Sequence, residues 1–105
     1  MKYKIKRKKY MEKNEKVTFE SVQQEMLDTY KRKNADYGNS FDESLDEFGI
    51  IAGIVRMSDK MQRLKSLTKP NVTQQVKDES IVDTLQDLAN YSIMTAVWLR
   101  NQKNR

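Results

Sequence analysis

Apolar residues recur every three or four positions along most of the chain, and this spacing predicts amphipathic helices. Thr18 is suited to cap the first helix, which we expect to run to about Lys33. The sequence NADYGNS should end this helix, because Gly38 can adopt a positive φ. The apolar face of the predicted helix is formed by Phe19, Val22, Met26, Leu27 and Tyr30.

Two further helical segments follow the NADYGNS turn. Ser40 begins a short one, and with Glu43 three residues later it matches the S-x-x-E capping box. Gly49 interrupts this segment, and a longer helix is predicted over residues 50–67. The proline of TKPNVTQQ prevents simple continuation, so residues 68–77 are the longest predicted loop. The longer helix has one apolar face, formed by Ile50, Ile54, Met57, Met61 and Leu64.

The last periodic segment predicts a helix from about Asp78 to Arg100. Its apolar sector contains Ile81, Val82, Leu85, Leu88 and Ala89. The opposite sector contains Glu79, Asp83, Gln86, Asp87 and Asn90. Because no strand pattern competes in the core, we predict an all-α fold, an antiparallel helical bundle of about four helices. It should form a single helical domain over residues 17–105, preceded by a basic N-terminal tail over residues 1–16.

The composition limits both the core and the available chemistry. Of 105 residues, 37% are hydrophobic and 33% are charged, which lie below and above the averages for globular proteins. A monomer would have to cover much surface with few apolar side chains, so we expect a homo-oligomer. The chain has no Cys and no His, which excludes disulfides and thiolate metal sites and removes the usual general base. Any catalysis must therefore use carboxylates, Lys, Tyr and hard cations.

The net charge of +5 is concentrated at the N-terminus. Residues 1–16 carry eight basic and two acidic residues, whereas the remaining 89 residues carry 12 basic and 13 acidic ones. We interpret the tail as a solvated extension, with weak non-specific contact to nucleic-acid phosphates as the alternative. No apolar run approaches the ~20 residues of a membrane span, and no secretory signal is recognised, so we expect no membrane association and a cytoplasmic location.

Three carboxylates of the last predicted helix form an unusual ladder. Glu79, Asp83 and Asp87 make two successive i,i+4 pairs of like charge, each destabilising an isolated helix by about 0.2–0.5 kcal/mol. The helix dipole accounts for Glu79 in the first turn but does not reach Asp87. If another helix or subunit covers this side, the carboxylates must be paired or must bind a cation.

Charged residues on two other predicted helices extend this pattern. Arg56, Asp59, Lys60 and Arg63 share one stripe, which is either an exposed ladder of salt bridges or a phosphate clamp. In the clamp, Lys60 and Arg63 bind anionic oxygens while Asp59 joins the acidic cluster around a metal. The segment SFDESLDEFG adds further carboxylates, among them Glu43 and Glu47. Clusters of oxygen ligands suit Mg²⁺ or Mn²⁺.

Three segments, KNADYGNSF, RMSDKMQRL and ESIVDTLQDLANYSIM, resemble in this order the nucleotide modification associated domain family of phages and bacteria. The resemblance covers roughly residues 18–100. It implies a role in nucleotide metabolism or base modification, in the host cytoplasm if a phage encodes the protein.

The layout is also similar, more distantly, to the MazG-like all-α nucleoside triphosphate pyrophosphatases. Their E-E-x-x-E and E-x-x-D motifs hold Mg²⁺ against the triphosphate. Residues 42–46, DESLD, match the first motif with Asp for Glu at both ends. Glu79 to Asp83 is E-x-x-x-D, which departs from the second motif and weakens the case for pyrophosphatase activity.

The sequence ADYG, within the segments that carry the resemblance, has two interpretations. In one, it is a helix-terminating turn with Tyr37 packed on the bundle. In the other, Tyr37 stacks on a nucleobase and Asn39 hydrogen-bonds its edge.

Three functional hypotheses follow from the sequence. The first is a protein that binds a nucleoside or deoxynucleoside triphosphate through Mg²⁺ or Mn²⁺, with metal ligands Glu43, Glu47, Glu79, Asp83 and Asp87. If it is a pyrophosphohydrolase, the candidate catalytic carboxylates are Glu43, Asp59 and Asp83. The second is a non-catalytic protein that sequesters a nucleotide or engages a host protein or nucleic acid through its basic tail. The third is a structural helical oligomer without a ligand.

Overall fold

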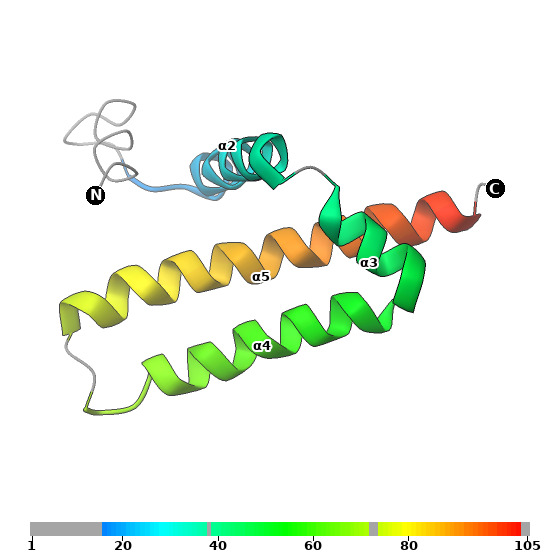
Figure 1. The fold of residues 1–105 in the computed structure, drawn as a ribbon. Coiled ribbons are helices and arrows are strands. Elements are labelled where there is room, and N and C mark those ends of the chain that lie inside the picture. Colours follow the sequence, from blue (N-terminus) through cyan, green and yellow to red (C-terminus); the bar gives the residue numbers. More distant parts are fainter. Residues whose placement is uncertain (1–15, 38, 72–73, 104–105) are drawn as a thin grey trace.

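The computed structural model describes residues 16–37, 39–71 and 74–103. These residues form four helices, α2 (Phe19–Tyr37), α3 (Ser40–Phe48), α4 (Ile51–Leu67) and α5 (Gln74–Lys103). The long helices α4 and α5 run side by side in opposite directions, and α2 and α3 pack on α5 (Figure 1). Within the described ranges no strand is present, which confirms the predicted all-α class and the helical bundle.

The start of α2 follows the sequence prediction closely. The Ser21 backbone N–H donates to Thr18 Oγ1 at 3.1 Å, and the Thr18 N–H donates to Ser21 Oγ at 2.9 Å. This reciprocal pair satisfies two N–H groups at the helix end. The helix continues to Tyr37, four residues beyond the predicted end. Asn34, despite its weak helix propensity, lies within the helix and lines a cleft beside α5.

The boundaries of α3 and α5 correct two predictions. Asn39, not Ser40, occupies the N-cap of α3 and makes no side-chain cap hydrogen bond, so the predicted capping box is wrong. Gly49 ends α3 with φ 78° and donates its N–H to the Leu45 carbonyl, which confirms the predicted interruption. The helix α5 begins at Gln74, so residues 74–77 are helical and the predicted loop is shorter.

The contact between α4 and α5 depends on small and hydroxylated residues. Gly53 of α4 is buried against Thr95 of α5, and a Cβ at this position would lie 2.9 Å from Thr95 Cγ2. The hydroxyls of Thr84 and Thr95 are buried, and each donates to a carbonyl one turn earlier in α5. These side chains therefore satisfy their own polar groups while allowing close approach of the two helices.

The inward faces of α4 and α5 differ from the predicted ones. On α4, Ile54 and Met61 are exposed, whereas Gly53 is buried and Lys60 is half-buried. On α5 the predicted polar sector is half-buried or buried, and in the predicted apolar sector Val82 and Leu85 are exposed. Gln86 is buried, while Leu85 is 49% exposed. Amphipathicity identifies the two sides of each helix, but the Gly53–Thr95 contact decides which side meets the partner helix.

Two predictions concern the surroundings of the chain. Residues 1–15, which are most of the predicted basic tail, lie outside the described residues, so the tail's contacts stay a prediction. In the described ranges, no helix is both long enough and apolar enough to cross a membrane.

Replacing Gly53 with Ala tests the helix contact. At an open helical position Ala would gain about 1 kcal/mol over Gly. Here the added methyl group meets Thr95, so we expect the free energy of unfolding to fall by roughly 1–3 kcal/mol in urea denaturation. Thr95→Ala removes the two closest atoms and should restore much of this loss in the double variant. A Gly53→Ala protein as stable as wild type would contradict the close packing.

Candidate functional site

A cleft of about 260 Å³ opens between α2, α3 and α5. Its lining combines aromatic rings with amide, hydroxyl, ammonium and carboxylate groups. The volume lies just below the range typical of small-molecule sites, and the mixed lining suits a flat ligand with polar edges. The lining residues are Tyr30, Lys33 and Asn34 of α2, Ser40 and Phe41 of α3, and Asp87, Asn90, Tyr91 and Met94 of α5.

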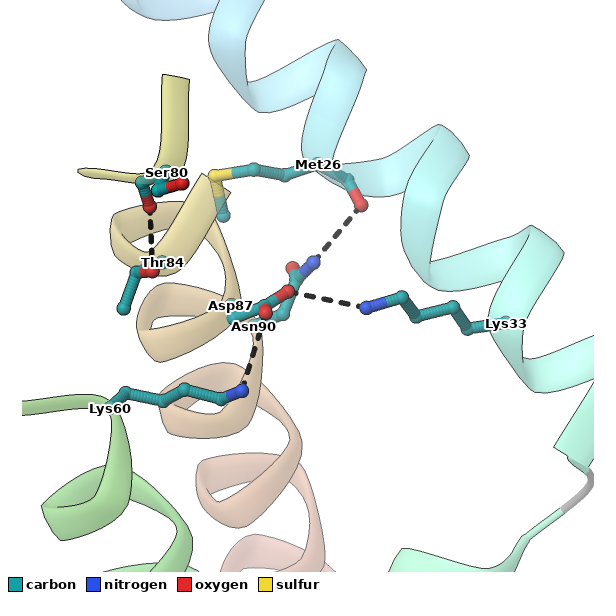
Figure 2. A network of polar contacts seen from close by, with 7 residues as sticks. All are labelled: Met26, Lys33, Lys60, Ser80, Thr84, Asp87 and Asn90. Atoms are coloured by element: carbon teal, nitrogen blue, oxygen red, sulfur yellow. Dashed lines mark hydrogen bonds and ion pairs between the residues drawn. The ribbon is translucent and has the colours of Figure 1, made fainter. Parts of the chain in front are cut away.

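The α5 side of the cleft comes from one face of that helix. Asp87, Asn90, Tyr91 and Met94 follow the spacing i, i+3, i+4 and i+7, which places them in line along the helix. Asn90 also fixes the position of α2, because its Nδ2 donates to the Met26 carbonyl at 3.2 Å (Figure 2). The polar sector of α5 is thus used to hold α2 and to line the cleft.

Tyr91 is held between two neighbouring groups. Its ring meets Phe41 edge to face, with 5.0 Å between the ring centroids and 72° between the planes. The Lys60 ammonium lies 5.9 Å from the Tyr91 centroid, within reach of a cation–π attraction. These contacts join α3, α4 and α5 and fix the orientation of an aromatic ring that lines the cleft.

Asp87 forms ion pairs with lysine side chains of two other helices. Its Oδ1 lies 3.3 Å from Lys33 Nζ of α2, and its Oδ2 lies 3.4 Å from Lys60 Nζ of α4 (Figure 2). The side chains of Asp87 and Lys60 are each 26% exposed, whereas that of Lys33 is 57% exposed. Among these three groups, the two ammonium groups carry one more charge than Asp87 neutralises.

The other predicted metal ligands form two pairs that lie apart, one on α3 and one on α5. Glu43 and Glu47 of α3 are exposed, and Glu79 and Asp83 of α5 are half-buried. Asp46 accepts a hydrogen bond from Trp98 Nε1 at 2.8 Å, so α3 lies near the end of α5. Glu79 lies 19 residues before Trp98, about 28 Å along the helix.

Among the described residues, no three Asp or Glu side chains come close enough together to hold a metal ion. The residues present therefore do not fit a metal centre formed by the protein alone. Ligation of Mg²⁺ or Mn²⁺ by Glu43, Glu47, Glu79, Asp83 and Asp87 stays a prediction.

The predicted phosphate and base ligands have different surroundings. Lys60 contacts Asp87, whereas Arg63 and the predicted catalytic Asp59 are exposed on α4. Asn39 is exposed at the junction of α2 and α3, next to the cleft residue Ser40. Tyr37 ends α2, and its side chain lies outside the described part of the structure. The roles of these residues in binding a ligand stay predictions.

Sequence reasoning missed several residues of the cleft. Phe41 has the helical spacing of a core residue. No local sequence motif identifies Tyr91 as a residue of the cleft. Lys33 lies 54 residues from Asp87, so no local pattern connects them. The signal that was available is the line of Asp87, Asn90 and Tyr91 on one face of the last predicted helix.

Replacing Asp87 with Asn tests the three-helix contact. The substitution leaves Lys33 and Lys60 close together without their shared carboxylate. We expect the free energy of unfolding to fall by about 1–2 kcal/mol in urea denaturation, because a partly buried charged hydrogen bond is lost. The loss should be smaller in high salt, which screens the repulsion of the two ammonium groups.

Lys33→Ala is the matched control, since Lys33 is more exposed and should contribute less than about 1 kcal/mol. Equal effects of the two substitutions, or none from Asp87→Asn, would contradict the central role of Asp87.

A comparison with protein families matches residues 33–99 to the family described as nucleotide modification associated domain 1. All the cleft residues except Tyr30 fall within this range. No curated protein matched the chain, and no solved structure did so. The more distant similarity to the MazG-like pyrophosphatases therefore stays a prediction.

Proposed function

Because the chain belongs to the nucleotide modification associated domain 1 family, we propose that the cleft between α2, α3 and α5 binds a nucleotide. The observation that carries the proposal is the lining of this cleft. It brings Phe41 and Tyr91 together with Lys33, so that aromatic faces and a cationic group border the same small volume. A nucleotide requires both, one for its base and the other for its phosphate.

The base is assigned to the end of the cleft near Phe41 and Tyr91. Stacking of a base on an aromatic side chain is worth about 1–3 kcal/mol, as judged by alanine substitution. The side-chain amides of Asn34 and Asn90 line the same volume and carry both donors and acceptors for a base edge. Asn39 and Tyr37, at the neighbouring junction of α2 and α3, are proposed as additional base contacts.

The phosphate is assigned to Lys33. Its side chain is more than half exposed at the cleft, so the ammonium group can reach a ligand without leaving a buried position. The two lysines exceed the charge of Asp87 by one, and an arriving phosphate would offset that excess. Lys60 supports the binding through its contact with Asp87, and Arg63 is available to a longer phosphate chain.

A divalent ion can accompany a nucleotide without a complete protein site. Mg²⁺ is commonly bound by one or two carboxylates together with substrate phosphates and water. Asp83, half-buried one turn before Asp87, is the carboxylate that we assign to such an ion. No catalytic step is assigned, and the proposal is limited to binding.

Titration calorimetry with a series of nucleosides, monophosphates and triphosphates tests these assignments. We expect Phe41→Ala to weaken binding of every member about tenfold, which equals about 1.4 kcal/mol. Lys33→Ala should remove only the gain that phosphates give over the nucleoside. Phe19→Ala and Lys31→Ala are matched controls on exposed positions of α2 and should bind like wild type.

The same titrations with and without Mg²⁺ test the ion. Asp83→Asn should abolish the increase in affinity that Mg²⁺ produces and leave metal-free binding unchanged. Release of pyrophosphate from the same mixtures distinguishes a hydrolase from a binding protein. Absence of nucleotide binding by the wild-type protein, or unchanged binding by both Phe41→Ala and Lys33→Ala, would reject the assignment of the cleft.

A further inference from the structure

One side of α5 carries a stripe of apolar residues with a charged residue at each end, and no described helix covers it. Ala89 at its middle is half-buried, and the other members are exposed. Its members follow each other at intervals of four, three, four, four, three and four residues, which keeps them on one side of the helix. Leu85 is 49% exposed and Ile93 is 54% exposed. The stripe consists of Asp78, Val82, Leu85, Ala89, Ile93, Ala96 and Arg100.

The stripe and the cleft lie on different sides of α5. Asp87, which contacts α2, is two residues from Ala89 and thus about 200° away around the helix. On α4, Lys60 leans toward Asp87, whereas Ile54 and Met61 lie on the other flank and are exposed. Ile54 and Met61 of α4 and the stripe of α5 therefore form one continuous face, opposite to α2.

The spacing of the stripe is the same from either end, with Ala89 at its centre. When a second copy of α5 is laid antiparallel on it, Leu85 falls opposite Ile93, and Asp78 falls opposite Arg100. Val82 and Ala96 pair in the same way, and Ala89 meets its own copy. Apolar residues meet apolar ones, an acid meets a base, and a small side chain, Ala89, lies where the helices cross. The pattern is the self-complementarity that a two-fold symmetric contact requires.

The exposed side of α4 also has a small residue near its middle, although its spacing is not symmetric as that of α5 is. Ile51, Ile54, Ser58, Met61 and Lys65 are exposed at intervals of three and four residues around Ser58. Gly53 lies against Thr95, and Ser92 Oγ contacts Met57 Sδ at 3.2 Å. These antiparallel contacts place Ser58 at about the level of Ala89. One two-fold axis can therefore pass through both small residues.

The size of the face is that of a dimer interface. A helix rises ~1.5 Å per residue and is ~10 Å wide, so the projected area of α4 and of the stripe of α5 is on the order of 600 Å². The accessible area is larger, because side chains project from this plane. A standard interface buries about 800 Å² per partner. Within the described residues, Leu45 is the one hydrophobic side chain that is fully buried. A second copy would supply the apolar core that the single chain lacks.

We propose that α4 and α5 pack against the same helices of a second copy of this chain. The resulting four-helix core has its two-fold axis at Ala89 and Ser58, and α5 lies antiparallel to its copy. This inference rests on the exposed face and its pattern, and it does not depend on the nucleotide cleft.

Cysteine cross-linking tests the axis, because the natural chain contains no cysteine. In the full-length protein, Ala89→Cys should form a disulfide-linked dimer under mild oxidation, since the axis brings the two copies of this residue together. Leu85→Cys should link to Ile93→Cys in a mixture of the two variants far more than to itself. Ser66→Cys, exposed on the other flank of α4, is the matched control and should stay unlinked.

Charge exchange tests the register independently, without touching the apolar core. Sedimentation equilibrium should show that the wild-type protein is a dimer. Asp78→Arg or Arg100→Asp alone should raise the dissociation constant of this dimer about tenfold or more. The double variant should regain the wild-type constant. A monomeric wild-type protein across the micromolar range, cross-linking of Ala89→Cys no faster than that of Ser66→Cys, or no recovery in the double variant would overturn the proposal.

Discussion

The two ion pairs of Asp87 connect the helices on which the candidate site depends. Lys33 brings α2 to the carboxylate and Lys60 brings α4 to it, while Asn90, three residues later, anchors the middle of α2. Without these contacts, few interactions would hold α2 on the polar side of α5. The cleft is the space that remains between α2 and α5 where α3 enters with Phe41. Its lining is therefore a consequence of how one acidic residue is neutralised.

Some helix ends could be predicted from the sequence, whereas the side of each helix that packs against the rest of the chain could not. Thr18 and Gly49 mark helix ends through hydrogen bonds to near neighbours, so their roles could be predicted. The acidic ladder predicts carboxylates that are paired or bind a cation, and in the structure Asp87 is paired with Lys33 and Lys60. Parts of the predicted apolar faces of α4 and α5, such as Ile54 and Leu85, are exposed in the single chain. Amphipathicity predicts that such a side is buried, but it does not say whether the same chain or another copy covers it.

The α4–α5 pair separates two surfaces with different chemistry. The side that faces α2 and α3 holds the polar and aromatic groups of the cleft, and most of it lies within the family match. The opposite side exposes aliphatic residues such as Ile54 and Ile93 in a self-complementary pattern. The proposed ligand site and the proposed self-association surface therefore use separate residues, and α5 contributes to both. A substitution on one side is expected to leave the other function intact, which allows the two proposals to be judged separately.

Chemical-shift mapping tests the central claim, that a nucleotide enters the cleft, most directly. In ¹⁵N-labelled protein titrated with a nucleoside triphosphate, we predict that the largest amide shifts occur at Ser40, Phe41, Asn90 and Tyr91. Ala96 and Ile54, on the opposite face, should change little. Shifts that cluster on the apolar face or in residues 1–15, or a titration without any saturable shift, would contradict the assignment of the cleft.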